Sequence, residues 1–125
     1  MPDRLEMMLE LQRTLQHRLF ATKIGLDFDR LDNEQRVAFI KDNIHFIVEE
    51  LHEMSRELPF VKHWKTYEVT EDMWNEALAK ARKEYTDAMH FFLNVGLLLG
   101  LDAGGIYTEY VLKNTVNHIR QDNNY

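Results

Sequence analysis

Apolar residues recur along most of the chain at steps of three and four, the spacing that places them on one face of an α-helix. The clearest run begins after Asp32 or Asn33, either of which can cap a helix, and ends before Pro59. Its apolar positions are Val37, Ile40, Ile44, Ile47, Leu51, Met54 and Leu58. This heptad-like stripe is predicted to face the core or a partner helix.

Three other segments carry helical spacing or helix signals. We expect helices over about 3–21, from Thr70 to about Gly100, and over about 102–121, whereas the alternating β-branched pattern of strands is not found. No linker or repeat divides the chain, so residues 1–125 are expected to form one domain. The predicted fold is all-α, a four- to five-helix bundle. Because helices of this size bury limited surface alone, we expect oligomerisation, as a homodimer or a tetramer, to complete it.

Composition argues against several classes of function. The chain has no cysteine, which excludes disulfides and thiolate metal sites. Its formal net charge of -6 disfavours nucleic acid as a partner, because binding a phosphate backbone needs clustered Lys and Arg. The most apolar window, 88–101, is shorter than the roughly 20 residues that span a bilayer, and the N-terminus lacks the pattern of a signal peptide. We expect no membrane partner and a cytoplasmic location, in a bacterial cell or a phage-infected host.

Two of the expected helices carry rows of polar and aromatic residues beside their apolar faces. One row is Asn43, Phe46, Glu50, Glu53 and Glu57, and the other is Glu84, Asp87, Phe91 and Asn94. If the rows face each other in an antiparallel bundle, four carboxylates converge, which requires a cation or raised pKa values. Such oxygen ligands suit Mg²⁺ or Mn²⁺. Taken alone, the same rows are also typical of the solvated faces of amphipathic helices.

The order Glu50-x-x-Glu53 and then Glu84-x-x-Asp87 resembles the E-x-x-E and E-x-x-D motifs of the all-α NTP pyrophosphohydrolases, which include MazG-like proteins and dimeric dUTPases. Three further segments are similar to the dUTPase branch, namely 9–16, 58–65 and the C-terminus from 113 onward, so that the resemblance covers nearly the whole chain. It implies a magnesium-dependent enzyme that converts a dNTP and water into a dNMP and pyrophosphate. The expected substrate is dUTP, with dCTP or a purine nucleotide such as dGTP as alternatives.

The resemblance also implies roles for individual residues. The metal ligands would be Glu50, Glu53, Glu84 and Asp87. Glu49 would orient or deprotonate the attacking water, which makes Glu49, Glu50 and Glu53 the expected catalytic residues. The phosphates and the sugar would contact Lys65, Lys113, Asn117, Arg120 and Tyr125. The base would contact Gln12 and Gln16 of the first helix, with Gln16 standing where the family has Asn. Trp64 and Asn94 are further candidates for the base, although a Trp followed by a Lys, as in Trp64-Lys65, is equally typical of a core anchor with a solvated neighbour.

Other interpretations stay open at this point. Glu49-x-x-His52 and Asp87-x-x-His90 are also compatible with a ferritin-like di-iron bundle, although such proteins use Glu-x-x-His twice. A non-enzymatic helical interaction module is a further hypothesis, favoured if the acidic rows are exposed and indifferent to metal. The Lys and Arg of the 113–120 segment share one helix face, and such a face is equally typical of an ordinary basic C-terminal turn.

Overall fold

The structure, a computed structural model, describes residues 2–60 and 64–124. Every regular element within these residues is helical, which confirms the predicted all-α class. They form two compact units, one made of residues up to 36 together with those from 96 onward, and the other made of residues 37–95. The single domain expected from the sequence stays a prediction.

In the first unit, α1 (Arg4–Leu19) begins at a reciprocal cap. The Asp3 carboxylate accepts a hydrogen bond from the Glu6 N–H at 2.8 Å, and the Glu6 carboxylate accepts one from the Asp3 N–H at 3.1 Å. The helix continues into a π-helical turn, η1 (Phe20–Ile24). Gly25 ends this turn in the left-handed conformation, with φ at 78°, which a residue without a Cβ adopts at little cost.

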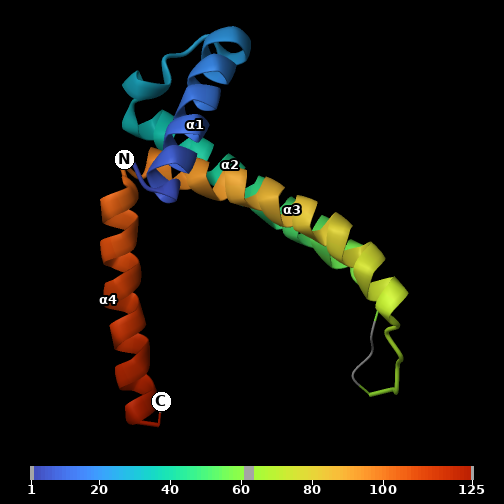
Figure 1. Cartoon of the computed structure of the whole chain (residues 1–125). Helices are drawn as coiled ribbons and strands as arrows, with labels where there is room; N and C mark the ends of the chain where they lie inside the picture. The colour runs from blue at the N-terminus through green and yellow to red at the C-terminus, as the bar shows by residue number, and fades with distance from the viewer. Residues whose placement is uncertain (1, 61–63, 125) are drawn as a thin grey trace. The chain divides into compact units, whose positions relative to one another are not determined.

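A short 3₁₀ turn, η2 (Phe28–Arg30), folds back against α1 (Figure 1). Phe28 is buried, and its ring packs edge-on against Phe20 and His17, with centroids 5.2 Å and 5.8 Å apart. The return of the chain onto α1 therefore depends on an aromatic contact at short sequence separation.

The last helix, α4 (Ala103–Asp122), also belongs to the first unit and contacts α1. Asp102 caps it by accepting a hydrogen bond from the Gly105 N–H at 2.7 Å. After Ala103 its side chains are exposed or half-buried. The exposed apolar ones include Tyr107, Tyr110, Leu112, Val116 and Ile119. Within a single chain, α4 keeps more apolar surface outside than a soluble helix ordinarily does.

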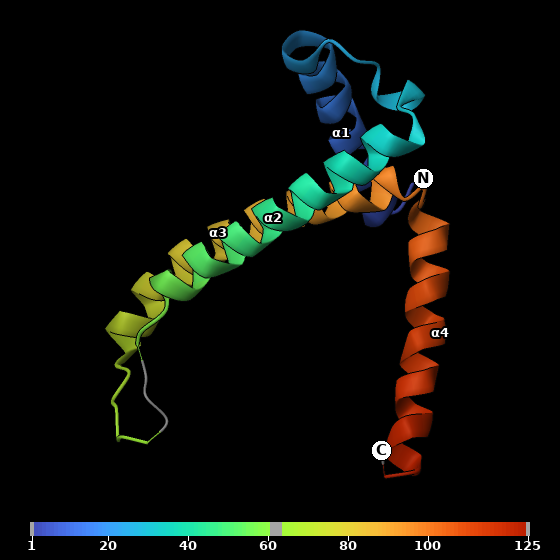
Figure 2. The same cartoon turned by 180° about the vertical axis from the view of Figure 1, so that it is seen from behind.

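The second unit is made of the greater part of α2 (Asn33–Glu57) and α3 (Glu71–Leu98), which run side by side in opposite directions in both views (Figures 1 and 2). Asp32 and Gln35 exchange hydrogen bonds of 2.8 Å and 3.0 Å at the start of α2. The Thr70 hydroxyl caps α3 by accepting from the Met73 N–H at 3.2 Å. Both helices thus begin at the caps expected from the sequence.

The apolar stripe of α2 does not lie in the core of the chain. Val37, Ile44 and Leu51 are 52%, 49% and 43% exposed, and the buried residue of this helix is Asn43, in the polar row. The stripe was predicted to face either the core or a partner helix, and the prediction that it faces the core is wrong for these residues. Contact of the stripe with a partner helix stays a prediction.

No single helix among the described residues is both long and apolar enough to cross a membrane. Among the described helices, α3 and α4 pass the test of length and composition when the two are taken together across the break between them.

Candidate active site

The two polar rows face each other along the α2–α3 pair. Three contacts between the rows follow one another along the helix pair. From one contact to the next, the residue number rises on α2 and falls on α3, as it must when two helices are antiparallel. Asn94 contacts Asn43, Phe91 packs on Phe46 with ring centroids 5.3 Å apart, and the carboxylates meet beyond them. The antiparallel arrangement expected from the sequence is therefore present, and it places the acidic motifs opposite each other.

The centre of the site is a group of carboxylates from both helices. Glu50, Glu84 and Asp87 each offer an oxygen, and these oxygens lie within 4.8 Å of one another. Glu53 lies close enough to hydrogen-bond with both glutamates and to raise their pKa values by its charge. Four carboxylates from two facing helices thus share one small region, as the spacing predicted.

The crowding changes the acidity of the group. Burial, hydrogen bonding with Glu84 and the charges of Glu53 and Asp87 raise the pKa of Glu50 from 4.5 to about 7. Hydrogen bonding with Glu50 lowers the pKa of Glu84, but hydrogen bonding with Glu53, burial and the neighbouring negative charges outweigh it and raise the pKa overall. Without a cation, the group therefore holds protons near neutral pH that isolated glutamates would have released.

The same group fits a divalent cation. Among the described residues, no hydrogen bond reaches the buried Oε2 atoms of Glu50 and Glu84. Buried polar atoms ordinarily find a partner, and several carboxylate oxygens on adjacent helices are the ligand set that a hard cation prefers. The residues present would satisfy both needs by holding a metal ion between the helices.

The surface along which α2 and α3 pack against each other is here called the seam. Away from the carboxylates, the seam contains a pair of side-chain amides. The Asn94 amide donates to Asn43 Oδ1 at 3.1 Å, and the Asn43 amide donates to the carbonyl oxygen of Phe39 at 2.8 Å. Both asparagines are buried, with exposed fractions of 8% for Asn43 and 4% for Asn94. The structure therefore places Asn94, expected at the base, next to a residue that was not proposed for the site.

Comparison with known proteins agrees with this arrangement. The profile of the dUTPase family matches residues 4–103. A dCTP pyrophosphatase of Enterobacteria phage T4 is 33% identical over 142 aligned residues, which cover 98% of this chain and 83% of the relative. A dCTP pyrophosphatase of Enterobacteria phage LZ5 is 29% identical over 143 residues, with the same coverage of both chains. No solved structure matches the chain.

The chain belongs to the dUTPase family. This member of the dUTPase family is accordingly a nucleoside triphosphate pyrophosphohydrolase, as the sequence motifs predicted. The hypothesis of a non-enzymatic helical module is therefore wrong. The di-iron alternative also finds no support in the described residues, because the carboxylate group contains neither His52 nor His90.

Three other residues expected at the site of this dUTPase family member lie outside the carboxylate group. Glu49 is outside the carboxylate group; its exposed side chain lies 3.9 Å from His45 Nε2. Trp64 and Lys65 are exposed in the segment between α2 and α3. None of these three is brought into the carboxylate group.

The remaining expected residues belong to the first unit. Gln12 and Gln16 are buried on α1, one turn apart. Lys113 and Asn117 are exposed on α4, and Arg120 on the same helix is half-buried. Tyr125 lies outside the described residues.

Beyond Glu84, toward the start of α3, Lys80 lines a hollow of about 210 Å³ together with Glu57 and residues at the adjoining helix ends. Its Nζ lies 3.8 Å from Glu76, and it occupies the position one helical turn before Glu84.

Proposed function

We propose that this dUTPase family member is a Mg²⁺-dependent pyrophosphohydrolase that converts a deoxynucleoside triphosphate and water into the monophosphate and pyrophosphate. The observation that carries the proposal is the carboxylate group between α2 and α3, in which two buried oxygens have no hydrogen-bond partner in the described part of the chain. Glu50, Glu53, Glu84 and Asp87 would hold the metal. Mn²⁺ has the same preference for oxygen ligands and would substitute for it.

We propose a pyrimidine deoxynucleotide, dUTP or dCTP, as the substrate. The family is named for dUTP and both phage relatives for dCTP, and neither name supports the purine alternative. Uracil and cytosine differ at ring position 4, where one carries a carbonyl oxygen and the other an amino group. A side-chain amide has both a donor and an acceptor, so the expected base contacts Gln12, Gln16 and Asn94 could complement either ring. Trp64 would supply an aromatic contact to the base.

Different side chains would perform different parts of the hydrolysis. A metal ion, when bound, supplies positive charge at the phosphate oxygens and stabilises the negative charge of the departing pyrophosphate. Glu49 would orient the attacking water or accept its proton, a role that its exposed carboxylate allows. The phosphates and the sugar would be bound by Lys65, Lys113, Asn117, Arg120 and Tyr125. The cations of this set complement a substrate that an acidic protein would otherwise repel.

We further propose that the enzyme acts as a homodimer or a larger oligomer. The apolar stripe of α2 and the exposed apolar residues of α4 lack cover within one chain, and burying them against a second copy would complete the helical bundle. Because both relatives are phage proteins, the proposed place of action is the cytoplasm of a phage-infected cell.

The substrate proposal is tested by measuring kcat/KM for pyrophosphate release from dUTP, dCTP, dTTP, dGTP and dATP. We expect dUTP and dCTP to exceed both purine nucleotides by at least about 100-fold, because a pocket built to pair polar groups rejects a base that leaves them unpaired. Replacing Gln16 by Asn, the residue of the family, should change the ratio of dUTP to dCTP turnover. A preference for dGTP or dATP would overturn the pyrimidine assignment.

A further inference from the structure

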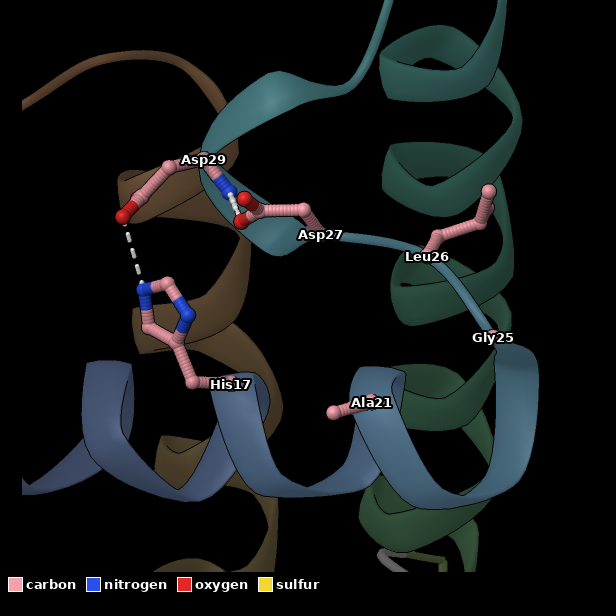
Figure 3. A pocket seen from close by; sticks show the side chains of 6 residues that line it. All are labelled: His17, Ala21, Gly25, Leu26, Asp27 and Asp29. Atoms are coloured by element: carbon pink, nitrogen blue, oxygen red, sulfur yellow. Dashed lines mark hydrogen bonds and ion pairs between the residues drawn. The ribbon is translucent and has the colours of Figure 1, made fainter.

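The first unit contains a second group of possible metal ligands. His17 on α1 lies beside Asp27 and Asp29 of the following turn, and one ligand atom from each lies within 4.8 Å of the other two. His17 Nε2 is 2.8 Å from Asp29 Oδ2, and the two side chains point toward each other (Figure 3). The group combines a ring nitrogen with two carboxylates, unlike the all-carboxylate group between α2 and α3.

Each of the three side chains is fixed by a contact behind it. Arg13 holds Oδ1 of Asp29 at 3.0 Å, which leaves Oδ2 on the side of His17. The Asp29 N–H donates to Asp27 Oδ1 at 3.0 Å, and the buried ring of Phe28 packs against the imidazole of His17. Outer contacts of this kind orient the ligands in protein metal sites.

There is room for a cation and its water ligands. His17, Asp27 and Asp29 line a hollow of about 490 Å³, whose other walls are Ala21, Gly25 and Leu26 (Figure 3). Asp27 Oδ2 lies 3.6 Å from Arg30 Nε, but the Arg30 side chain is 86% exposed and can leave into solvent. Donors bound to Zn²⁺ at about 2.0 Å lie roughly 3.3 Å apart, so small side-chain rotations would bring these three atoms to that spacing.

We propose that His17, Asp27 and Asp29 form a second metal site, selective for a divalent transition-metal ion such as Zn²⁺. Mg²⁺ prefers oxygen ligands, whereas an imidazole nitrogen with two carboxylates is a donor set that suits Zn²⁺. A bound ion would link α1 to the turn that follows Gly25 and would stabilise the folded chain. This site is independent of the carboxylates that we assign to catalysis.

The test uses the full chain with the substitutions Glu50→Gln and Glu84→Gln, which neutralise the competing carboxylate group. Zn²⁺ binding is followed by calorimetry and by the midpoint of thermal unfolding. We expect one Zn²⁺ per chain and a midpoint rise of at least about 5 °C at a hundredfold excess of Zn²⁺ over Kd, since a ligand that binds only the folded state stabilises it. Mg²⁺ at the same concentration should leave the midpoint unchanged.

Two further variants identify the ligands. Asp27→Asn keeps an oxygen that can accept from the Asp29 N–H, so the turn is retained while the charged ligand is lost. His17→Gln removes the nitrogen ligand. Each should weaken Zn²⁺ binding by at least about 10-fold, the loss typical of weakening a metal site. The matched control is His45→Gln, which removes the histidine of the 3.9 Å pair with Glu49 and should bind Zn²⁺ unchanged.

The proposal is overturned if Zn²⁺ neither binds nor shifts the unfolding midpoint, or if both variants bind it as tightly as their parent does. Repeating the titration with the unsubstituted protein in saturating Mg²⁺ keeps the test decisive should the double substitution impair folding. None of these readouts depends on pyrophosphate release, so the result is separate from that of the proposed reaction.

Discussion

The side-chain amide of Asn94 donates a hydrogen bond to Asn43 Oδ1 at 3.1 Å, joining α3 to α2 inside the seam. Because the Asn43 amide donates in turn to the Phe39 carbonyl, the orientation of both amides is fixed by hydrogen bonding. The pair lies on the same rows as the carboxylates, about two helical turns away from them. The register of the two helices at the carboxylates is therefore supported by a buried polar contact.

Replacing Asn43 by Leu should lower the free energy of unfolding by about 1–3 kcal/mol, because the buried Asn94 amide loses its acceptor. Urea unfolding followed by circular dichroism measures the change. The control is Thr86→Ala, which removes an exposed hydroxyl bonded at 2.9 Å to the Arg82 carbonyl and should cost less than about 0.5 kcal/mol. The double substitution of Asn43 and Asn94 by Leu should cost less than the sum of the single ones. Additive losses would show that the two amides do not interact.

The raised pKa of Glu50 predicts a stability that depends on pH when metal is absent. In the folded chain the pKa is about 7, against 4.5 ordinarily, so the folded state holds this proton more tightly than the unfolded state does. The resulting stability is fully present below about pH 4.5 and is lost as the pH rises through about 7. Urea unfolding in EDTA should therefore show a lower free energy of unfolding at pH 8 than at pH 5. In Glu50→Gln the difference should be smaller, and an unchanged difference would contradict the assignment to this carboxyl.

Metal binding should release protons from the same group. A cation binds the ionised carboxylates, so Mg²⁺ must displace a proton wherever Glu50 is still protonated. Affinity should rise between pH 6 and pH 8, and calorimetry in two buffers of different ionisation enthalpy should show net proton release near pH 6.5, just below the pKa of about 7. Asp42→Asn, on an exposed residue of the same helix, is the control and should leave both quantities unchanged. If Mg²⁺ binding to the unsubstituted protein were independent of pH, the metal would not displace a proton from Glu50, and the prediction would be refuted.

The exposed apolar surface predicts self-association. Leu112 on α4 is 57% exposed and Leu51 in the stripe of α2 is 43% exposed. Sedimentation equilibrium should show a species of at least twice the chain mass of 15.0 kDa. Placing a charge on either surface, as in Leu112→Glu or Leu51→Glu, should weaken the assembly by at least about 10-fold in Kd. A monomer at micromolar concentration would refute the prediction.

The sequence predicted the helices well because their ends are set by local chemistry. Thr70 caps α3 as expected, α4 begins next to residue 102 where its start was expected, and α2 ends before Pro59. The first helix was less well predicted, because the backbone passes into a π-helical turn at Phe20. The burial of Phe28 against that turn is a tertiary contact between residues that carry no joint periodicity.

The carboxylate group was predictable for a similar reason, since residues three and four apart on a helix share a face. The burial of individual apolar residues was not predictable from the sequence, because periodicity shows that a helix face is apolar without showing what covers that face. On α3 the aromatic residues Tyr85 and Phe92 are 59% and 62% exposed, while the polar Gln12 and Gln16 of α1 are buried. Residues set apart from one another in the chain, such as Asn43 and Asn94, become a pair only when the register of the two helices is known.

We propose that the carboxylates between α2 and α3 hold the metal that pyrophosphate release requires. The most direct test is to measure release from dUTP and dCTP by the unsubstituted protein, by Glu84→Gln and by the control Asp42→Asn, each in Mg²⁺ and in EDTA. We predict Mg²⁺-dependent release that EDTA abolishes, that Asp42→Asn retains, and that Glu84→Gln reduces by at least about 100-fold. Equal rates with and without metal, or full activity of Glu84→Gln, would show that these carboxylates do not hold a catalytic metal.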